Sequence, residues 1–164
     1  MAAAGFMKVT ADGVEIRGDS SVTSLDREDT IEVVEVNHDV TSPVDSSTAS
    51  RSGQREHRVL RVTARVDRAV PLMYKAWSYN ESCEVLLRFF RQDLAGTGQE
   101  TEYFTITLTG AGVAALKLHW PNSLRPETAA IPEQIEYAFT YERILWESLD
   151  GNLAHEDQWF ESRY

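Results

Sequence analysis

The sequence has little of what marks disulfide-linked, membrane-spanning or signal-bearing proteins. Its 164 residues include one cysteine, Cys83, so an internal disulfide is excluded and the fold needs no oxidising compartment. No apolar run approaches the roughly 20 residues of a membrane-spanning helix, so we expect no membrane insertion. Residues 1–8 lack a basic region followed by a sustained apolar stretch, which predicts that the chain has no signal peptide.

Positive charge is also scarce. The net charge is −10, because 26 acidic residues outnumber 16 lysines and arginines. Nucleic acids and anionic membrane surfaces attract proteins with an excess of basic residues, so we expect neither as the main partner. The hydrophobic fraction of 42% is typical of a globular protein. A chain of this length usually forms one domain, and we expect residues 1–164 to do so.

Signatures of catalysis are absent as well. Residues 96–98 and 110–112 are Gly-x-Gly segments that lack the lysine of a phosphate loop, so they are interpreted as strand turns. No histidine signature accompanies Cys83, which favours a buried, inert thiol. His38-Asp39 and residues 155–157 have no recognised metal-ligand spacing. We therefore predict a protein that is not an enzyme and has no catalytic residues, no metal site and no cofactor.

Hydrophobic alternation with a period of two dominates the chain and predicts β-strands. The segments with this pattern are residues 6–10, 14–18, 30–38, 60–67, 84–92, 102–108, 114–120 and 135–146. Asp12-Gly13 favours a tight hairpin turn between the first two. The apolar phase changes between Tyr141 and Ile144, which predicts a bulge or a bend. Strands joined by short turns indicate a barrel or a sandwich.

One amphipathic helix is predicted, at about residues 69–79. Its apolar residues recur at spacings of three and four and form one stripe. They are Leu72, Met73, Ala76 and Trp77. Pro71 suits the first helical turn, where its missing N–H has no cost. We expect residues 150–164 to form a turn followed by a short polar tail.

Residues 41–54 lie between two predicted strands and contain almost no side chain that a core would bury. A structureless loop of this length is uncommon in a small β domain, and such loops are usually functional or disordered. We interpret this extended loop as a segment that reaches outward to a neighbouring copy of the same chain.

Two further features favour contacts between copies. Leu86 and Phe90 make the second face of strand 84–92 apolar, as in a strand that is either enclosed in a core or covered by a partner. Arginines form a local basic run in this acidic chain, namely Arg51, Arg55, Arg58, Arg61, Arg65 and Arg68. Such a run is either a solvated strand face or a stripe that pairs with carboxylates of a neighbouring subunit, and Arg61 and Arg65 are the candidates for such pairs.

An ordered set of short motifs extends from about Phe6 to Trp159. It comprises the early hairpin, Ile31-Glu32-Val33-Val34, Pro43-x-Asp45, Gly53-x-Arg55-x-His57, Val66-Asp67, Pro71-x-Met73-Tyr74-Lys75-Ala76, Glu102-Tyr103-Phe104, Glu133-Gln134-Ile135-Glu136, Ile144-x-Trp146, and Asp150-Gly151-Asn152 with His155, Asp157 and Trp159. In these motifs the chain resembles the hemolysin-coregulated protein (Hcp) family, the inner-tube subunits of type VI secretion systems. The C-terminal motif is the most specific of the set.

The resemblance implies a fold and a function. The fold is mainly β, a compact β-barrel of two antiparallel sheets with one flanking α-helix and a long extended loop. The function is structural: a homo-hexamer forms a ring, and stacked rings form a tube inside a contractile sheath, with a spike protein at the tip. The ring lumen can hold effector proteins. The protein is then cytoplasmic during assembly and later secreted into a target cell without a signal peptide.

The resemblance also suggests roles for individual residues. Contacts between subunits or rings are expected from Pro43, Val44, Asp45, Thr48, Gly53 and Arg55. A subunit interface is expected at Arg61, Arg65, Leu86 and Phe90. Glu35 and Asn37 are expected to face the lumen. Two alternatives stay open at this point: a tail-tube protein of another phage-like contractile particle, and a monomeric β-barrel that binds a small ligand.

Overall fold

The computed structural model describes residues 3–160. Within these residues the chain is mainly β, with one α-helix, α1 (Val70–Ser78), and one short 3-10 helix, η1 (Ser24–Asp26). The strands are β1 (Ala4–Ala11), β2 (Val14–Ile16), β3 (Ile31–Asn37), β4 (Val40–Thr41), β5 (Val44–Asp45), β6 (Ser50–Arg51), β7 (Glu56–His57), β8 (Leu60–Arg65), β9 (Cys83–Gln92), β10 (Glu100–His119), β11 (Gln134–Thr140), β12 (Arg143–Ser148) and β13 (Leu153–Gln158).

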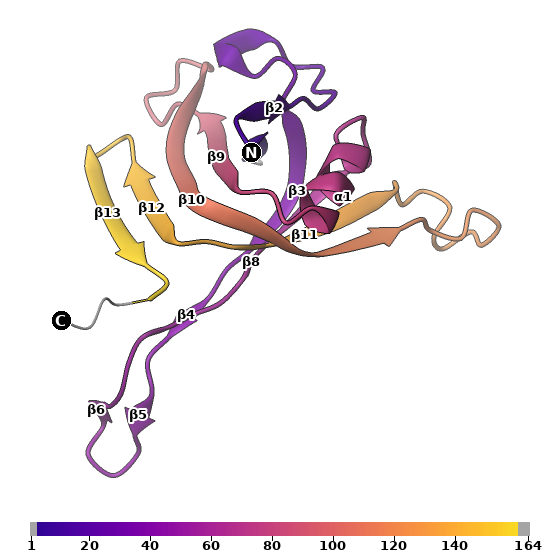
Figure 1. Cartoon of the computed structure of the whole chain (residues 1–164). Coiled ribbons are helices and arrows are strands. Elements are labelled where there is room, and N and C mark those ends of the chain that lie inside the picture. Colours follow the sequence, from indigo (N-terminus) through magenta and orange to yellow (C-terminus); the bar gives the residue numbers. More distant parts are fainter. Residues whose placement is uncertain (1–2, 161–164) are drawn as a thin grey trace.

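The principal sheet closes on itself to form the barrel seen in Figure 1. Its strands run in the order β11-β8-β3-β1-β9-β10, and β10 also pairs with β11, which completes the circuit. Every pairing in the circuit is antiparallel. The two predicted layers are joined through β10, which pairs first with β9 and β12 and then with β11. The predicted fold class, including the flanking helix, is confirmed.

β10 is one bent strand, so the turn predicted at residues 110–112 is wrong. The strand continues through Gly110, whose φ is 61°, and changes partners there. A second bend separates β11 from β12 at residues 141–142, where the change of apolar phase predicted one. The Glu142 N–H donates to the Thr109 carbonyl (3.0 Å), so the two bends lie against each other. A Cβ at residue 110 would meet the Glu142 carboxylate, which accounts for the glycine.

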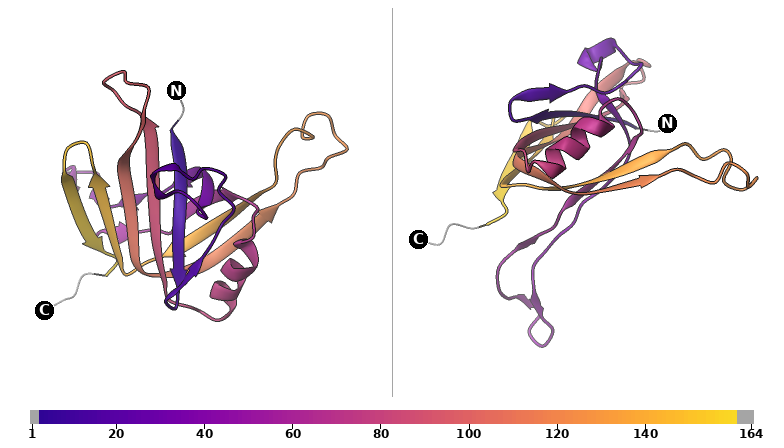
Figure 2. Two further views of the ribbon diagram at one scale, coloured as in Figure 1. Left: turned by 90° about the horizontal axis from the view of Figure 1, so that it is seen from above. Right: turned by 45° about the vertical axis from the view of Figure 1, so that its right-hand side comes forward.

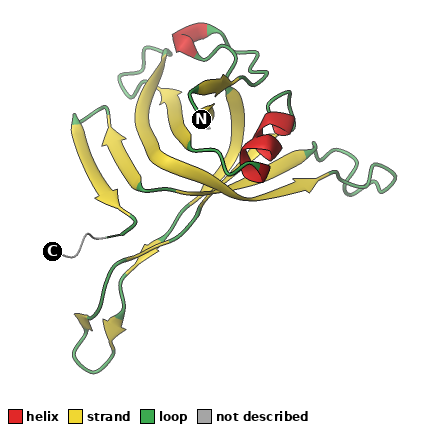
Figure 3. Cartoon of the chain, in the orientation of Figure 1, coloured by secondary structure: helices red, strands yellow, loops and turns green. Residues whose placement is uncertain are grey.

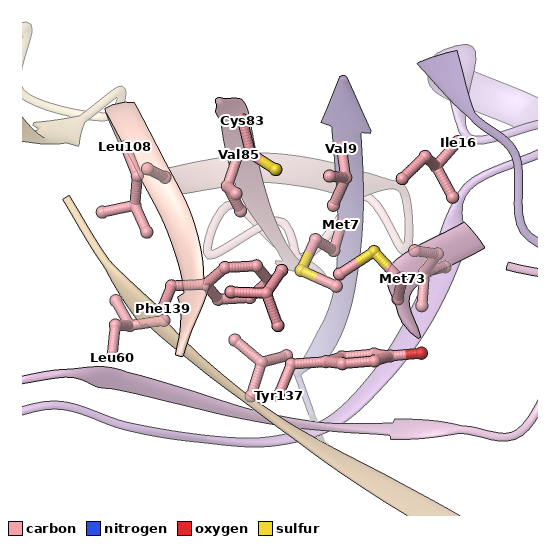
Figure 4. Close-up of a cluster of buried hydrophobic side chains, with 14 of the residues drawn as sticks. Met7, Val9, Ile16, Leu60, Met73, Cys83, Val85, Leu108, Tyr137 and Phe139 are labelled. Atoms are coloured by element: carbon pink, nitrogen blue, oxygen red, sulfur yellow. The ribbon is translucent and has the colours of Figure 1, made fainter. Parts of the chain in front are cut away.

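Apolar side chains from alternate positions of the strands fill the barrel interior (Figure 4). Tyr137 and Phe139 of β11 are the large side chains in the middle of this cluster, and Met7 of β1 lies beside them. The predicted hairpin at Asp12-Gly13 is confirmed, with φ values of 46° and 80° that suit a tight turn between β1 and β2. The core therefore arises from the period-two pattern of the sequence.

α1 packs against β10 and agrees with the predicted helix within about one residue at each end. The predicted apolar stripe is only partly right, because Leu72 is 43% exposed and Trp77 51% exposed. The buried face of the helix consists of Val70, Met73 and Ala76. Neither α1 nor any other helical segment of residues 3–160 has the length and apolar character that a membrane crossing needs.

β12 and β13 extend the sheet beyond the barrel. β13 pairs with β12 from Arg143↔Gln158 to Ser148↔Leu153, so the polar tail predicted after residue 150 is a strand at residues 153–158. Residues 161–164 lie outside the described part of the chain. Figure 2 shows this pair on the side of the molecule opposite the loop that joins β10 to β11.

Candidate assembly surface

Residues 40–57, called the hairpin below, project away from the barrel between β3 and β8 (Figures 1 and 2). All of them except Ser42 and His57 are exposed, and the exposed fraction of Val44 is 63%. The prediction that this segment buries almost nothing is confirmed. The prediction that it is structureless is wrong, because β4 pairs with β7 and β5 pairs with β6. The segment is a two-stranded ribbon (strands shown in Figure 3).

Local hydrogen bonds shape the tip of the hairpin. The Ala49 N–H donates to the Asp45 carbonyl (2.8 Å), and the Ser52 N–H donates to the Pro43 carbonyl (2.7 Å). The Asp45 carboxylate accepts from the Ser47 hydroxyl (2.7 Å) and the Ser47 N–H (2.9 Å), and these bonds lower the pKa of Asp45. Short polar side chains commonly stabilise turns in this way. The tip is therefore ordered by its own residues.

The base of the hairpin is attached to the barrel through Tyr141, the residue after β11. Its hydroxyl oxygen lies 2.7 Å from His57 Nδ1 and 2.9 Å from His38 Nε2. The Arg58 carbonyl is 3.4 Å from the same oxygen. His57 belongs to β7 and His38 follows β3, so one hydroxyl group contacts both sides of the ribbon at its base. Burial raises the pKa of Tyr141, which keeps this hydroxyl protonated.

Asp157 of β13 completes the base. His57 Nε2–H donates to Asp157 Oδ2 (2.8 Å), and the Arg55 guanidinium donates to both carboxylate oxygens (3.1 and 3.0 Å). Burial alone would raise the pKa of Asp157, but the hydrogen bonds from His57 and Arg55 outweigh it and hold that pKa below its ordinary value. The ionised carboxylate thus links the hairpin to the C-terminal strand. We call His38, Arg55, His57, Tyr141 and Asp157 the base cluster.

Aromatic rings enclose the base cluster. Trp159 stacks on His57, with ring centroids 6.1 Å apart and an interplanar angle of 29°, and meets Tyr141 edge-on at 4.9 Å. Trp146 lies tilted against His38 at 6.2 Å. His57 is consequently only 8% exposed. Hydrogen bonds in such a water-poor environment are strong when all partners are present and costly to break.

The six residues expected to contact another subunit or ring fall into two groups. Five lie at exposed positions of the distal hairpin, namely Pro43, Val44, Asp45, Thr48 and Gly53. The sixth, Arg55, lies in the base cluster and binds Asp157 of its own chain. Contact with another subunit or ring stays a prediction for all six, and Arg55 has in addition a structural role within its own subunit.

Phe90, one of the four residues predicted at a subunit interface, is 0% exposed, so that prediction is wrong for Phe90. Its ring contacts Phe6 edge-on (5.7 Å), and the Arg27 guanidinium lies 4.4 Å from its centroid. Arg27 also pairs with Glu100 (2.8 Å) and holds its loop over this face of β9. Around Phe90 the face is therefore enclosed within its own chain, which was the other alternative, and an interface role of Leu86 stays a prediction. Leu86, on the same face, is half-buried.

Arg61 and Arg65 have exposed side chains that pair within the chain. Arg61 binds Glu136 on the neighbouring strand β11 (3.0 Å), and Arg65 binds Glu32 on β3 (3.2 Å). The structure therefore shows a solvated, internally paired strand face. A role for these arginines between subunits stays a prediction, because a neighbouring carboxylate would have to share or replace the internal one.

Glu35 and Asn37, the residues predicted to face a lumen, lie in β3 close to the start of the hairpin. Both side chains are exposed, and the Asn37 amide donates to the Glu35 carboxylate (2.9 Å). Asn37 is also the cross-strand partner of Arg61. The pair is thus available to an outside partner, and its position in a lumen stays a prediction.

Cys83 is buried, as predicted, and burial raises the pKa of its thiol to about 11. A thiol with such a pKa is a poor nucleophile at neutral pH. Among residues 3–160, no group of three or more His, Cys, Asp or Glu side chains is arranged to hold a metal ion. The histidines at positions 38 and 57 instead bind Tyr141.

His38 and Tyr141 were not predicted from the sequence as members of a site. Tyr141 fits the buried face of its strand, and nothing in its pattern distinguishes it from Tyr137 or Phe139. The available signal was indirect. Arg55 and His57 belong to one of the motifs that carry the resemblance, and Asp157 belongs to another, and the structure brings the two motifs together.

Comparisons with known proteins agree with this geometry. The family model described as "Type VI secretion system effector, Hcp" matches residues 6–147. The chain is 29% identical over 133 residues to the "Major exported protein" of Pseudomonas aeruginosa, covering 80% of this chain and 76% of that one.

Solved structures give the same result. A crystal structure of an Hcp protein has a TM-score of 0.85 and 28% identity, covering 98% of this chain and all of that one. Hcp1 from the E. coli EAEC 042 pathovar has a TM-score of 0.82 and 27% identity, covering 97% of this chain and all of that one. The family match spans most of the chain, and the fold agrees over nearly its whole length. This chain belongs to the Hcp family of type VI secretion systems.

Proposed function

We propose that this chain is the repeating subunit of a type VI secretion inner tube, in which copies close into hexameric rings and the rings stack. Family membership supports the type VI secretion role. The observation that supports contact between copies is the hairpin. It is ordered, it is almost wholly exposed to solvent, and it projects away from its own barrel.

The hairpin has no apolar face of its own to stabilise it. An isolated two-stranded hairpin is at best marginally stable in water. Here the base cluster and the tip hydrogen bonds hold it in an extended shape, although the barrel gains almost no burial from it. A segment that is costly to order and buries nothing in its own subunit is suited to contact a second subunit, in the same ring or the next one.

A ring of identical subunits needs two different complementary surfaces on each copy. The hairpin supplies one surface, and the exposed strand face with Arg61 and Arg65 is the candidate for another. The remaining partners in this proposal are a contractile sheath around the tube, a spike protein at its tip and effector proteins in its lumen. The export of the Pseudomonas aeruginosa relative supports a secreted destination after assembly in the cytoplasm.

The ring and the hairpin contact are tested together by solution mass and electron microscopy. Wild-type protein should have a sixfold mass and form ring-shaped particles that stack. A variant in which residues 43–54 are replaced by Asn-Gly keeps the Thr41↔Glu56 pair and Arg55, and shortens the ribbon to a tight turn. We expect this variant to keep its far-ultraviolet circular dichroism and to lose ring mass or stacking. A wild-type monomer at high concentration would contradict the ring, and an unchanged variant would contradict the hairpin contact.

The carrier role is tested at Asn37. The substitution Asn37→Trp adds a bulky ring to an exposed position of β3. If this residue faces the lumen, co-purification of effector proteins with the ring should fall while ring mass is unchanged. Unchanged cargo retention would place Asn37 outside the lumen.

A further inference from the structure

The base cluster contains two imidazole rings on one hydroxyl group. A tyrosine hydroxyl has a single proton to donate, whereas Tyr141 has a ring nitrogen of His57 at 2.7 Å and one of His38 at 2.9 Å. The two histidines therefore cannot both accept from Tyr141, and at least one of them donates to its oxygen. The direction of these bonds depends on how many protons the two rings hold.

Asp157 fixes the direction when both histidines are neutral. Its ionised carboxylate only accepts, so the neutral His57 ring carries its proton on Nε2 and donates to Asp157 Oδ2 (2.8 Å). His57 Nδ1 then accepts from the Tyr141 hydroxyl, and His38 Nε2–H donates to the Tyr141 oxygen. These bonds form one continuous chain from His38 through Tyr141 and His57 to Asp157 without an additional proton.

This arrangement is lost when each of the two rings carries a second proton. Both rings would then donate to the Tyr141 oxygen, whose own proton would be left with the Arg58 carbonyl at 3.4 Å, a long contact. Two positive rings would also share one oxygen inside an aromatic enclosure, where charge is poorly solvated. Asp157 and Asp39 oppose this repulsion, whereas Arg55 and Arg58 add to it.

We propose that His38, Tyr141 and His57 form a proton-sensitive hinge, which fixes the hairpin at one angle to the barrel when both histidines are neutral and releases it when both are protonated. Burial and the neighbouring His57 lower the pKa of His38, which agrees with a ring held neutral in the closed arrangement. Two clefts border the cluster, of about 560 Å³ beside His57 and about 330 Å³ beside His38, so a proton has only a short path from solvent to each ring.

The hinge itself does not depend on the proposed function, but its consequence for stacking does. Release of the hairpin at acidic pH would remove the ordered surface that contacts a second copy. A tube subunit would then assemble near neutral pH and lose stacking in an acidic medium. His38, Tyr141 and His57 act in this proposal as positioning residues of the hairpin.

The test measures the angle of the hairpin directly. Spin labels are placed at the tip by Ser46→Cys and on the barrel by Thr109→Cys, both exposed positions, and labelled protein is diluted into unlabelled protein. Buried Cys83 does not compete for the label. We expect one narrow distance at about pH 7.5 and a broad, reversible distribution at about pH 5, below the ordinary histidine pKa of about 6.5.

Two variants separate the hinge from a purely structural contact. Tyr141→Phe keeps the ring against Trp159 and removes the shared hydroxyl, so its distribution should be broad at both pH values. Tyr137→Phe is the matched control on β11, because the Tyr137 hydroxyl is buried and has no hydrogen-bond partner in the described chain. The control should behave like wild type.

A wild-type distribution that stays narrow at about pH 5, well below the ordinary histidine pKa of about 6.5, overturns the proposal, and this comparison requires no variant. Light scattering of the same samples separates the hinge from the ring. A monomer whose hairpin distance still changes with pH would support the hinge and contradict the ring. A ring-sized mass with a pH-independent hairpin distance would support the ring and contradict the hinge.

Discussion

The barrel and the hairpin are stabilised by different interactions, although the same two strands lead from one into the other. In the barrel, side chains of β8 alternate between core and solvent, and both β3 and β8 have neighbours on either side. In the hairpin, nearly every side chain is exposed, and order comes from polar contacts at the tip and the base. The barrel therefore resists disturbance through many contacts, whereas the hairpin depends on a few.

The largest effect is expected where the barrel loses core volume. Phe139→Ala removes a fully buried ring and should lower the free energy of unfolding by about 3–5 kcal/mol. Urea denaturation of the variant measures this loss. Hydrogen exchange in the barrel and the hairpin should then rise together, because the hairpin is ordered only when the barrel is folded. A hairpin that stays protected in an unfolded barrel would contradict this dependence.

A smaller and more local effect is expected at the base cluster. Asp157→Asn removes the charge that binds Arg55 and His57, and such charged hydrogen bonds contribute about 1.5–3 kcal/mol. Hydrogen exchange should increase in residues 40–57 and in β13, with little change in β1 and β9. Asp150→Asn is the matched control, since Asp150 binds the exposed Arg91 away from the hairpin. Equal effects of the two substitutions would show that the base cluster does not order the hairpin.

The same contrast explains what the sequence could and could not predict. Barrel strands follow period-two patterns, so the strands, the helix and the bend after Tyr141 were predictable. The bent β10 was not, because Gly110 suits both a turn and a strand that bends with a positive φ. β13 lacks β-branched residues and forms because β12 offers it an edge, which no local pattern reveals.

The base cluster was the hardest feature to predict. Its hydrogen bonds connect residues about a hundred positions apart, such as His38 with Tyr141 and His57 with Asp157. Period and propensity describe neighbours along the chain and carry no information about such pairs. The hairpin was mistaken for a structureless loop for a related reason, since serines, aspartate and glycine are typical of loops. Here they hydrogen-bond to one another and order the ribbon.

Protonation of His38 should weaken folding less than Asp157→Asn does. The pKa of His38 is lowered in the folded chain, so the unfolded chain binds more protons and stability falls as the pH drops below about 6.5. The pKa of Asp157 is also lowered, so its contribution persists above about pH 3.9 and is lost only as the pH falls further. Urea titrations across this range should show two steps. His38→Gln should abolish the first step and keep the second. If the first step is unchanged in this variant, its assignment to His38 is refuted.

The smallest effect on folding is expected from the exposed arginines, where the comparison between barrel and assembly is sharpest. The double substitution Arg61→Glu and Arg65→Glu replaces two exposed ion pairs, each of which contributes less than about 1 kcal/mol. Subunit stability should therefore change little. Each new glutamate faces Glu136 or Glu32, but at these exposed positions solvent weakens the repulsion between the two carboxylates. Ring mass by light scattering should nevertheless fall if these arginines pair with a neighbouring copy. The double substitution Arg17→Glu and Arg143→Glu, at two other exposed arginines paired within the chain, is the control for net charge. If the double variant and the control both assemble like wild type, the arginine face is an ordinary solvated strand surface, and the second ring contact lies elsewhere.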